Sequence, residues 1–293
     1  MQKQPKNQPQ VIEELRPGQS IELLKELHIL TREGKLNQDT RRKLKQVYHL
    51  HQFIEPLLNS VLKTNASFTL ADHGAGKSYL GFILYDLFFN VARAGLATSG
   101  HIYGIETRTE LVEKSCALAV RLGFEHMSFL NASVLEATAS SALPATIDIV
   151  TALHACDTAT DDAIAFALAK GAWHMVLVPC CQAEVAGVLK QGKALNLSRT
   201  PLAELWRHPL HTREFGSQIT NVLRCLQLEA SGYRVTVTEL VGWEHSMKNE
   251  LILASKPERI DRAASDSAAN RLQRVLAELG LDEMAARFGV IQT

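Results

Sequence analysis

The residues best placed to do chemistry are an aspartate and two closely spaced glycines, in the order Asp72-His73-Gly74-Ala75-Gly76. A short run of β-prone residues, 68–71, precedes them, and helix-favouring residues follow from Lys77. Glycines at a strand-to-helix turn let a ligand approach the backbone, because no Cβ blocks it and positive φ is accessible. Turns of this kind bind nucleotides or nucleotide-like molecules in open α/β sheets. We therefore expect a ligand at 72–76.

One interpretation of this turn is a phosphate-binding loop, because Gly76-Lys77-Ser78 matches the end of that motif. The first glycine of the motif would fall at Ala71, however, and Asp72 would lie inside the loop. A carboxylate there would repel phosphate groups where backbone N–H groups should cradle them. An ATP-binding protein is therefore the alternative interpretation of the turn.

The second interpretation rests on the pattern acidic-x-Gly-x-Gly, which resembles motif I of class I S-adenosylmethionine-dependent methyltransferases. That cofactor carries a sulfonium and an amino acid instead of phosphates, so Asp72 would favour its binding. The next predicted strand, 101–105, ends at Glu106, whose carboxylate could accept hydrogen bonds from both ribose hydroxyls. Glu106 lies 30 residues beyond Gly76, and a long first helix accounts for this spacing.

The length and composition of the chain limit its domain organisation and the partners it could bind. A chain of 293 residues can hold one large α/β domain and an extension. Lys and Arg (31) balance Asp and Glu (31), so contact with a nucleic acid would need local basic patches. Five cysteines without paired spacing indicate reduced thiols and a cytoplasmic location. The sequence has neither an apolar run of 18 residues nor an apolar signal segment near Met1.

Alternating strand and helix patterns predict a parallel sheet. The predicted strands are 67–72, 101–105, 127–131, 146–153, 174–179, 233–240 and 249–255. Five parallel strands followed by an antiparallel hairpin form a Rossmann-like α/β fold, the seven-stranded class I methyltransferase sheet. We expect a helical extension over 1–64, with about the first 18 residues disordered, a methyltransferase domain over 65–256 and helices over 257–293. Pro56 predicts a kink or a break in the second helix of the extension.

The carboxyl ends of the strands supply further candidates, because ligands of open α/β sheets bind there. The third strand ends at Asn131 and is followed by Ala132 and Ser133; Asn131 could bind the adenine or could simply form a turn. His154 and Asp157 follow the fourth strand, and Asp157 could instead cap the next helix. We expect His154 to contact the cofactor. His154 or Asp157 is our candidate for receiving a proton from the acceptor.

Four segments in order resemble a methyltransferase-domain family of bacterial proteins and eukaryotic methyltransferase-like and glutathione-S-transferase-C-terminal-domain-containing proteins. They are Asp72–Leu80, Leu153–Asp157, Val178–Gln182 and Lys248-Asn249. The resemblance spans about residues 40–256 and implies binding of S-adenosylmethionine. Eukaryotic members commonly carry a Gly between the Cys and Asp of the fourth-strand motif and a Tyr or His after the paired cysteines. This chain lacks that Gly and has Gln182, so its site chemistry could differ.

Cys180 and Cys181, after the fifth strand, allow three interpretations. RNA methyltransferases that act on carbon 5 of pyrimidines carry a nucleophilic Cys at a similar place, but their Asp-Pro-Pro and second Pro-Cys elements are absent here. The two cysteines could bind a metal ion with His154 and Cys156, although no C-x-x-C pair is present. A structural turn beneath the substrate pocket is the interpretation we favour, so we predict no metal ion.

Two basic segments suggest RNA, tRNA or rRNA, as the methyl acceptor. One is Arg41–Lys45, and the other spans 190–224 with the basic residues Lys190, Lys193, Arg199, Arg207, Arg213 and Arg224. Both would flank the acceptor side in this fold, although solvated charge runs are common. A protein or small-molecule acceptor, or a cofactor-binding scaffold without catalysis, is the alternative. The sequence does not predict the oligomeric state.

Overall fold

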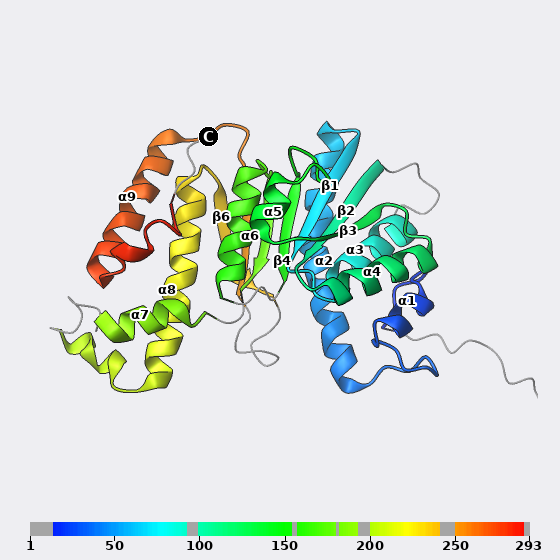
Figure 1. Cartoon of the computed structure of the whole chain (residues 1–293), viewed down its shortest axis with the longest axis horizontal. Helices are drawn as coiled ribbons and strands as arrows, with labels where there is room; N and C mark the ends of the chain where they lie inside the picture. Colours follow the sequence, from blue (N-terminus) through cyan, green and yellow to red (C-terminus); the bar gives the residue numbers. More distant parts are fainter. Residues whose placement is uncertain are drawn as a thin grey trace, which may run out of the picture.

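A computed structural model of the chain describes residues 14–92, 99–153, 157–179, 182–192, 200–240 and 250–289. Within these ranges seven strands form one sheet, each at the place predicted from the sequence (Figure 1). The strands are β1 Ser67–His73, β2 Ser99–Glu106, β3 Met127–Asn131, β4 Ile149–Leu153, β5 His174–Val178, β6 Arg234–Glu239 and β7 Glu250–Ser255.

The strand order is β3-β2-β1-β4-β5-β7-β6. The first five strands are parallel, and β7 runs antiparallel to both β5 and β6. The predicted sheet of five parallel strands and a terminal antiparallel pair is therefore confirmed. The order of strands reverses between β1 and β4, and such a reversal is where open α/β sheets bind ligands, beyond the carboxyl ends of the strands.

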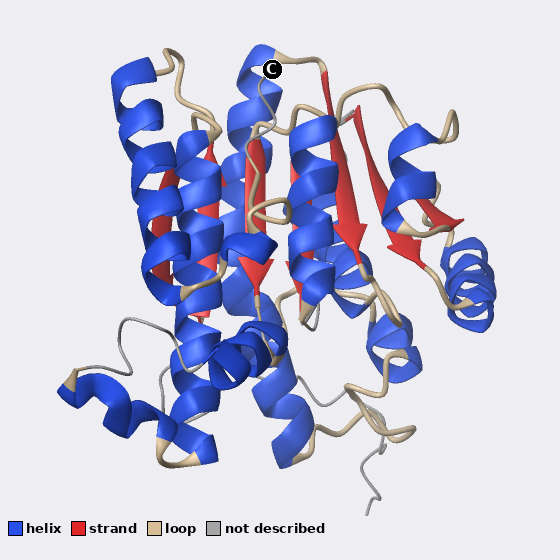
Figure 2. Ribbon diagram, turned by 60° about the vertical axis from the view of Figure 1, so that its left-hand side comes forward, coloured by secondary structure: helices blue, strands red, loops and turns tan. Residues whose placement is uncertain are grey.

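Helices cover both faces of the sheet (Figure 2). One face carries α1 Ile21–Glu26, α2 Gln38–Thr64, α3 Tyr79–Tyr85 with the π-helical segment η1 Asp86–Ala92, and α4 Thr109–Leu122. The other carries α5 Val134–Ala139, α6 Thr158–Ala169 and α8 Pro209–Ala230. Outside α8 lie α7 Glu184–Gly192, η3 Pro201–Trp206, α9 Arg262–Leu279 and η4 Asp282–Met284. Among the described helices, none has the length and apolar composition needed to cross a membrane.

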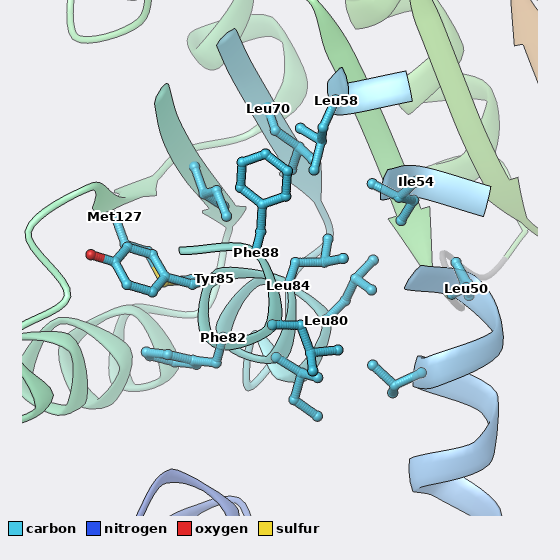
Figure 3. Close-up of a cluster of buried hydrophobic side chains, with 14 of the residues drawn as sticks. Leu50, Ile54, Leu58, Leu70, Leu80, Phe82, Leu84, Tyr85, Phe88 and Met127 are labelled. Atoms are coloured by element: carbon cyan, nitrogen blue, oxygen red, sulfur yellow. The ribbon is translucent and has the colours of Figure 1, made fainter. Parts of the chain in front are cut away.

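The longest of the described helices, α2, belongs to the core of the sheet. Its buried apolar residues recur every three or four positions and pack against β1 and α3; they include Leu44, Val47, Leu50, Ile54, Leu58 and Val61. Figure 3 shows Leu50, Ile54 and Leu58 pointing toward the side chains of α3 and β1. The helix runs without interruption through Pro56, so the predicted break into two helices is not found. Burial of this stripe outweighs the backbone hydrogen bond that a proline removes.

One basic residue of the 190–224 segment is not at the surface. The side chain of Arg224 is fully buried, and its guanidinium donates hydrogen bonds to Asp161 Oδ1 (2.5 Å), Asn221 Oδ1 (3.1 Å) and the carbonyl of Asp157 (2.8 Å). The prediction that Arg224 contributes to a basic RNA-binding surface is therefore wrong. Its charge is neutralised by the buried Asp161, 63 residues away along the chain.

We expect Arg224→Met to destabilise the fold by about 3–5 kcal/mol, because it leaves the Asp161 carboxylate buried without its partner. Urea-induced unfolding measures this free energy. Arg213→Met is the matched control: Arg213 and its partner Glu214 are both exposed, so the loss should stay within about 1 kcal/mol. Equal, small losses in the two variants would contradict the role assigned to the buried pair.

Candidate functional site

The turn after β1 has the conformation that its glycines predict. Gly74 and Gly76 both have positive φ, at +66° and +58°. A Cβ added at Gly74 would meet no atom within 4 Å, so this side of the loop is open. Ser78 also has positive φ, and α3 begins only at Tyr79. The loop therefore presents its backbone beyond the carboxyl end of β1.

Asp72 ends the apolar part of β1 with its carboxyl buried. Only 2 % of the residue is exposed, and Asp72 Oδ1 accepts a hydrogen bond from Thr151 Oγ1 of β4 at 2.8 Å. Burial raises the pKa of this carboxyl to about 7, against the opposing effect of that hydrogen bond. A cation beside Asp72 would favour the ionised form.

His73 points to the opposite face of the sheet, toward α6. It is buried, and its ring centroid lies 5.8 Å from that of Phe166. Neither ring nitrogen has a hydrogen-bond partner among the described residues. Burial lowers the pKa of His73 to about 4, so the ring is neutral at pH 7. A buried imidazole without partners leaves a donor and an acceptor unsatisfied.

Glu106, at the end of β2, is joined to the glycine loop. Its Oε2 accepts a hydrogen bond from the Gly76 N–H at 2.8 Å, and the guanidinium of Arg108 binds both oxygens at 3.0 Å each. Burial alone would raise the pKa of this carboxyl. The hydrogen bonds from Arg108 and from backbone N–H groups outweigh that effect and lower the pKa to about 2.

The candidates after β3 hold the neighbouring turns together. The Asn131 side-chain amide donates to the carbonyls of Glu106 (3.1 Å) and Thr107 (2.9 Å), and the Ala132 N–H donates to that of Glu106 (3.2 Å). Ser133 caps α5, whose third residue returns a hydrogen bond to it. In this arrangement Asn131 forms the turn that its alternative interpretation describes. An adenine contact from 131–133 stays a prediction.

Asp157 lies at the start of α6 in a backbone conformation that only glycine adopts easily, with φ +50° and ψ −119°. It occupies the N-cap position, but its side chain makes no capping hydrogen bond. Its Oδ1 instead accepts a hydrogen bond from the Ala183 N–H at 3.3 Å, and its carbonyl accepts one from Arg224. These contacts tie the end of β4 to the segment after β5.

The remaining candidates after β4 and β5 lie outside the described residues, namely His154, Cys156, Cys180 and Cys181. Their predicted roles, including the metal-site alternative, therefore stay predictions. Within the described ranges, no group of three or more His, Cys, Asp or Glu side chains is arranged to hold a metal ion.

A cavity of about 380 Å³ lies against the glycine loop. Asp72, the loop residues 74–77, Arg108 and Leu153 form one part of its wall. Tyr79 and Leu80 of α3 also line it, and the rest comes from the extension, through Ile29 and one face of α2 made of Lys43, Gln46, Val47 and Leu50. The sequence predicts the basic segment Arg41–Lys45, which includes Lys43, beside the acceptor; the contribution of Ile29, Gln46, Val47 and Leu50 to the wall was not predicted. The spacing of the four α2 residues places them on one face of the helix, where the stripe of buried core residues begins. That spacing is the sequence pattern that could have indicated this part of the wall.

We expect the stability difference between Asp72→Asn and the wild type to depend on pH. The folded-state pKa of Asp72 is raised, so its ionisation destabilises the fold increasingly between pH 4 and 7, and by a constant amount above. An amide side chain at this position cannot ionise, so the variant should gain up to about 4 kcal/mol over the wild type across this range. Urea unfolding at a series of pH values measures the gain, with the exposed Asp39→Asn as control. A pH-independent difference would contradict a buried, titrating Asp72.

Known proteins resemble the chain in sequence and in structure. The sequence model of a family described as a methyltransferase domain matches residues 42–188. Among solved structures, magnesium protoporphyrin IX methyltransferase from Synechocystis PCC 6803 is similar at 13 % identity and a TM-score of 0.43, covering 82 % of this chain and 95 % of that one. TrmK from M. capricolum is similar at 13 % identity and a TM-score of 0.39, with coverage of 79 % and 94 %.

A third similar structure is an rRNA methylase from Streptococcus thermophilus, at 11 % identity and a TM-score of 0.40, with coverage of 70 % of this chain and 95 % of that one. Comparison with curated protein sequences gives no significant match. The family match takes in α2, the glycine loop, Glu106 and the strands through β5. It spans half of the chain, so the protein belongs to this methyltransferase family and is, as its sequence predicts, a class I methyltransferase with S-adenosylmethionine as cofactor.

Proposed function

We propose that this methyltransferase acts on RNA, tRNA or rRNA, and that the cavity beside the glycine loop is where cofactor and acceptor meet. The observation that carries the proposal is the composition of the cavity wall. It combines Asp72 and 74–76 of the cofactor motif with Lys43 from the basic segment Arg41–Lys45. A reduced, cytoplasmic setting, predicted from the cysteines, suits such an acceptor.

The residues of the loop fit the cofactor. The open space at Gly74 leaves room for a ligand against the backbone, and the carboxyl of Asp72 favours a positively charged neighbour. In this proposal Asp72 and 74–76 hold the methionine part, Glu106 holds the ribose, and 131–133 lie toward the adenine; His73, predicted to bind the cofactor, points away from the cavity. The bound cofactor supplies a methyl group on a positively charged sulfur. The protein then contributes alignment of the acceptor and exclusion of water.

Asp157 and His154 are the two candidates for receiving a proton from the acceptor, and of these only Asp157 lies within the described residues. Its carboxylate is fixed by the Ala183 N–H, and its backbone is fixed by Arg224. A general base has to be held in this way to act at a defined atom. Cys180 and Cys181 keep their proposed place at the end of β5, as nucleophile or as part of a structural turn.

The positions of the basic residues support an RNA acceptor. In Figure 1 the lower ends of α2 and α8 extend past the carboxyl ends of the parallel strands. Arg42, Lys43 and Lys45 are exposed at the α2 end, where Arg41 pairs with Glu14. On the α8 side, Lys190 is exposed, and Arg207 and Arg213 are exposed beside acidic partners. Lys193 and Arg199 lie outside the described residues.

We expect Gly74→Val to abolish binding of S-adenosylhomocysteine, the demethylated product, in isothermal titration calorimetry. A side chain there projects into the open space that the cofactor needs, and the positive φ adds strain of about 1–3 kcal/mol. Gly187→Ala is the control, because a Cβ at that helical position also meets no atom within 4 Å. The wild type should show no affinity for ATP. Magnesium-dependent ATP binding would instead favour the phosphate-loop interpretation.

We expect tritiated methyl groups from S-adenosylmethionine to appear in RNA when total RNA, total protein and metabolites from a knockout strain are offered separately. RNA binding should weaken steeply with salt, because each phosphate contact releases a counterion. Replacing Arg42, Lys43 and Lys45 with Gln should flatten that dependence. Label in protein or metabolites alone would exclude RNA as acceptor. Cofactor binding without transfer to any fraction would indicate a scaffold.

A further inference from the structure

The carboxylate of Glu106 has all its hydrogen-bonding capacity in use. Its Oε1 accepts from the backbone N–H groups of Thr107 (3.0 Å) and Arg108 (3.1 Å), from the Thr107 hydroxyl (3.3 Å) and from Arg108 Nε (3.0 Å). Its Oε2 accepts from the Gly76 N–H (2.8 Å) and from Arg108 Nη2 (3.0 Å). A carboxylate offers about four lone-pair sites, so these donors leave none open for another ligand.

The donors differ in how firmly they are held. Three are backbone N–H groups of the turns after β1 and β2, and they keep their place as long as those turns are folded. A fourth donor is the Thr107 hydroxyl, which belongs to the same turn and does not line the cavity. The other two belong to the guanidinium of Arg108, whose side chain is 58 % exposed and lines the cavity. Nη2 of Arg108 also lies 3.7 Å from the position of a Cβ at Gly76. The guanidinium is therefore the group that a ligand can displace.

We infer that Arg108 occupies the ribose-binding positions of Glu106 and leaves them when the cofactor binds. The inference rests on the proposed function of Glu106 as the residue that holds the ribose. Two ribose hydroxyls can replace the two guanidinium N–H donors one for one, since both pairs bridge a carboxylate. Arg108 thereby competes with the cofactor and sets its affinity.

Release of Arg108 also redistributes the charge of the cavity, because the guanidinium separates from the Glu106 carboxylate. While it is paired, its positive charge is neutralised by Glu106. Once displaced, the guanidinium lies at the rim of a cavity that Lys43 and Lys77 also line. Cofactor binding then makes a third cation available to an anionic acceptor. We therefore expect the cofactor to bind before the acceptor and to strengthen acceptor binding.

The test is calorimetric titration of S-adenosylhomocysteine into the full chain and its Arg108→Met variant. Removing the competitor should tighten binding about fivefold, the upper range for an exposed ion pair. Arg121→Met is the matched control, since Arg121 lies in α4, the helix that Arg108 precedes, and pairs with the exposed Glu26. Glu106→Gln should weaken binding. Raising the salt concentration should tighten wild-type binding relative to Arg108→Met, because salt screens the competing pair.

Two results would overturn the inference: unchanged affinity in Arg108→Met, or affinity weakened while thermal unfolding without ligand matches the wild type. The second result would mean that Arg108 contacts the cofactor directly. Failure of the proposed function looks different. In that case the wild type itself would not bind S-adenosylhomocysteine, or Glu106→Gln would bind it as well as the wild type does.

Discussion

The hydrogen bond from the Gly76 N–H to Glu106 joins the ends of β1 and β2, and the geometry of the site depends on it. It fixes a loop whose two glycines have positive φ, and it orients the carboxylate that closes the neighbouring strand. Asn131 extends the same connection to β3 through two backbone carbonyls. Three strand ends that are distant in sequence thus form one rigid edge, which is what a preorganised binding site requires.

A second set of contacts stabilises the other half of the site. Arg224 links α8 to Asp161 in α6 and to the strained backbone of Asp157. Asn221, one turn earlier in α8, contacts Glu250 at the start of β7 and Gln182 after β5. A strained backbone conformation persists where the surrounding contacts hold it in place. At Asp157 the buried guanidinium of Arg224 supplies such a contact. The chain therefore keeps a glycine-like conformation at a residue that carries a carboxylate.

The seven strands and the glycine turn could be predicted from the sequence, because both depend on local patterns of apolar residues and turn residues. The burial of Arg224 could not be predicted, because its partner Asp161 is 63 residues away and no local sequence pattern indicates the pair. In the sequence, Arg224 looks like one more basic residue of a charged surface segment. The continuity of α2 through Pro56 was not predicted for a similar reason, because it depends on the burial of this helix against the rest of the fold. The site was predicted at its strand ends. Arg41–Lys45 was predicted to flank the acceptor, but the contribution of Gln46, Val47 and Leu50 to the cavity wall was not, since periodicity shows that a helix has a face but not what it packs against.

The double role of α2, in the core and in the cavity wall, has a consequence for how relatives of this protein can diverge. Leu50 belongs both to the core beneath the sheet and to the wall of the cavity, and Val47 does the same. A change that reshapes the cavity at these positions also alters packing in the core. Selection for a new acceptor would therefore be coupled to selection for stability. Lys43 and Gln46 line the cavity without belonging to that core, so they can change without altering its packing.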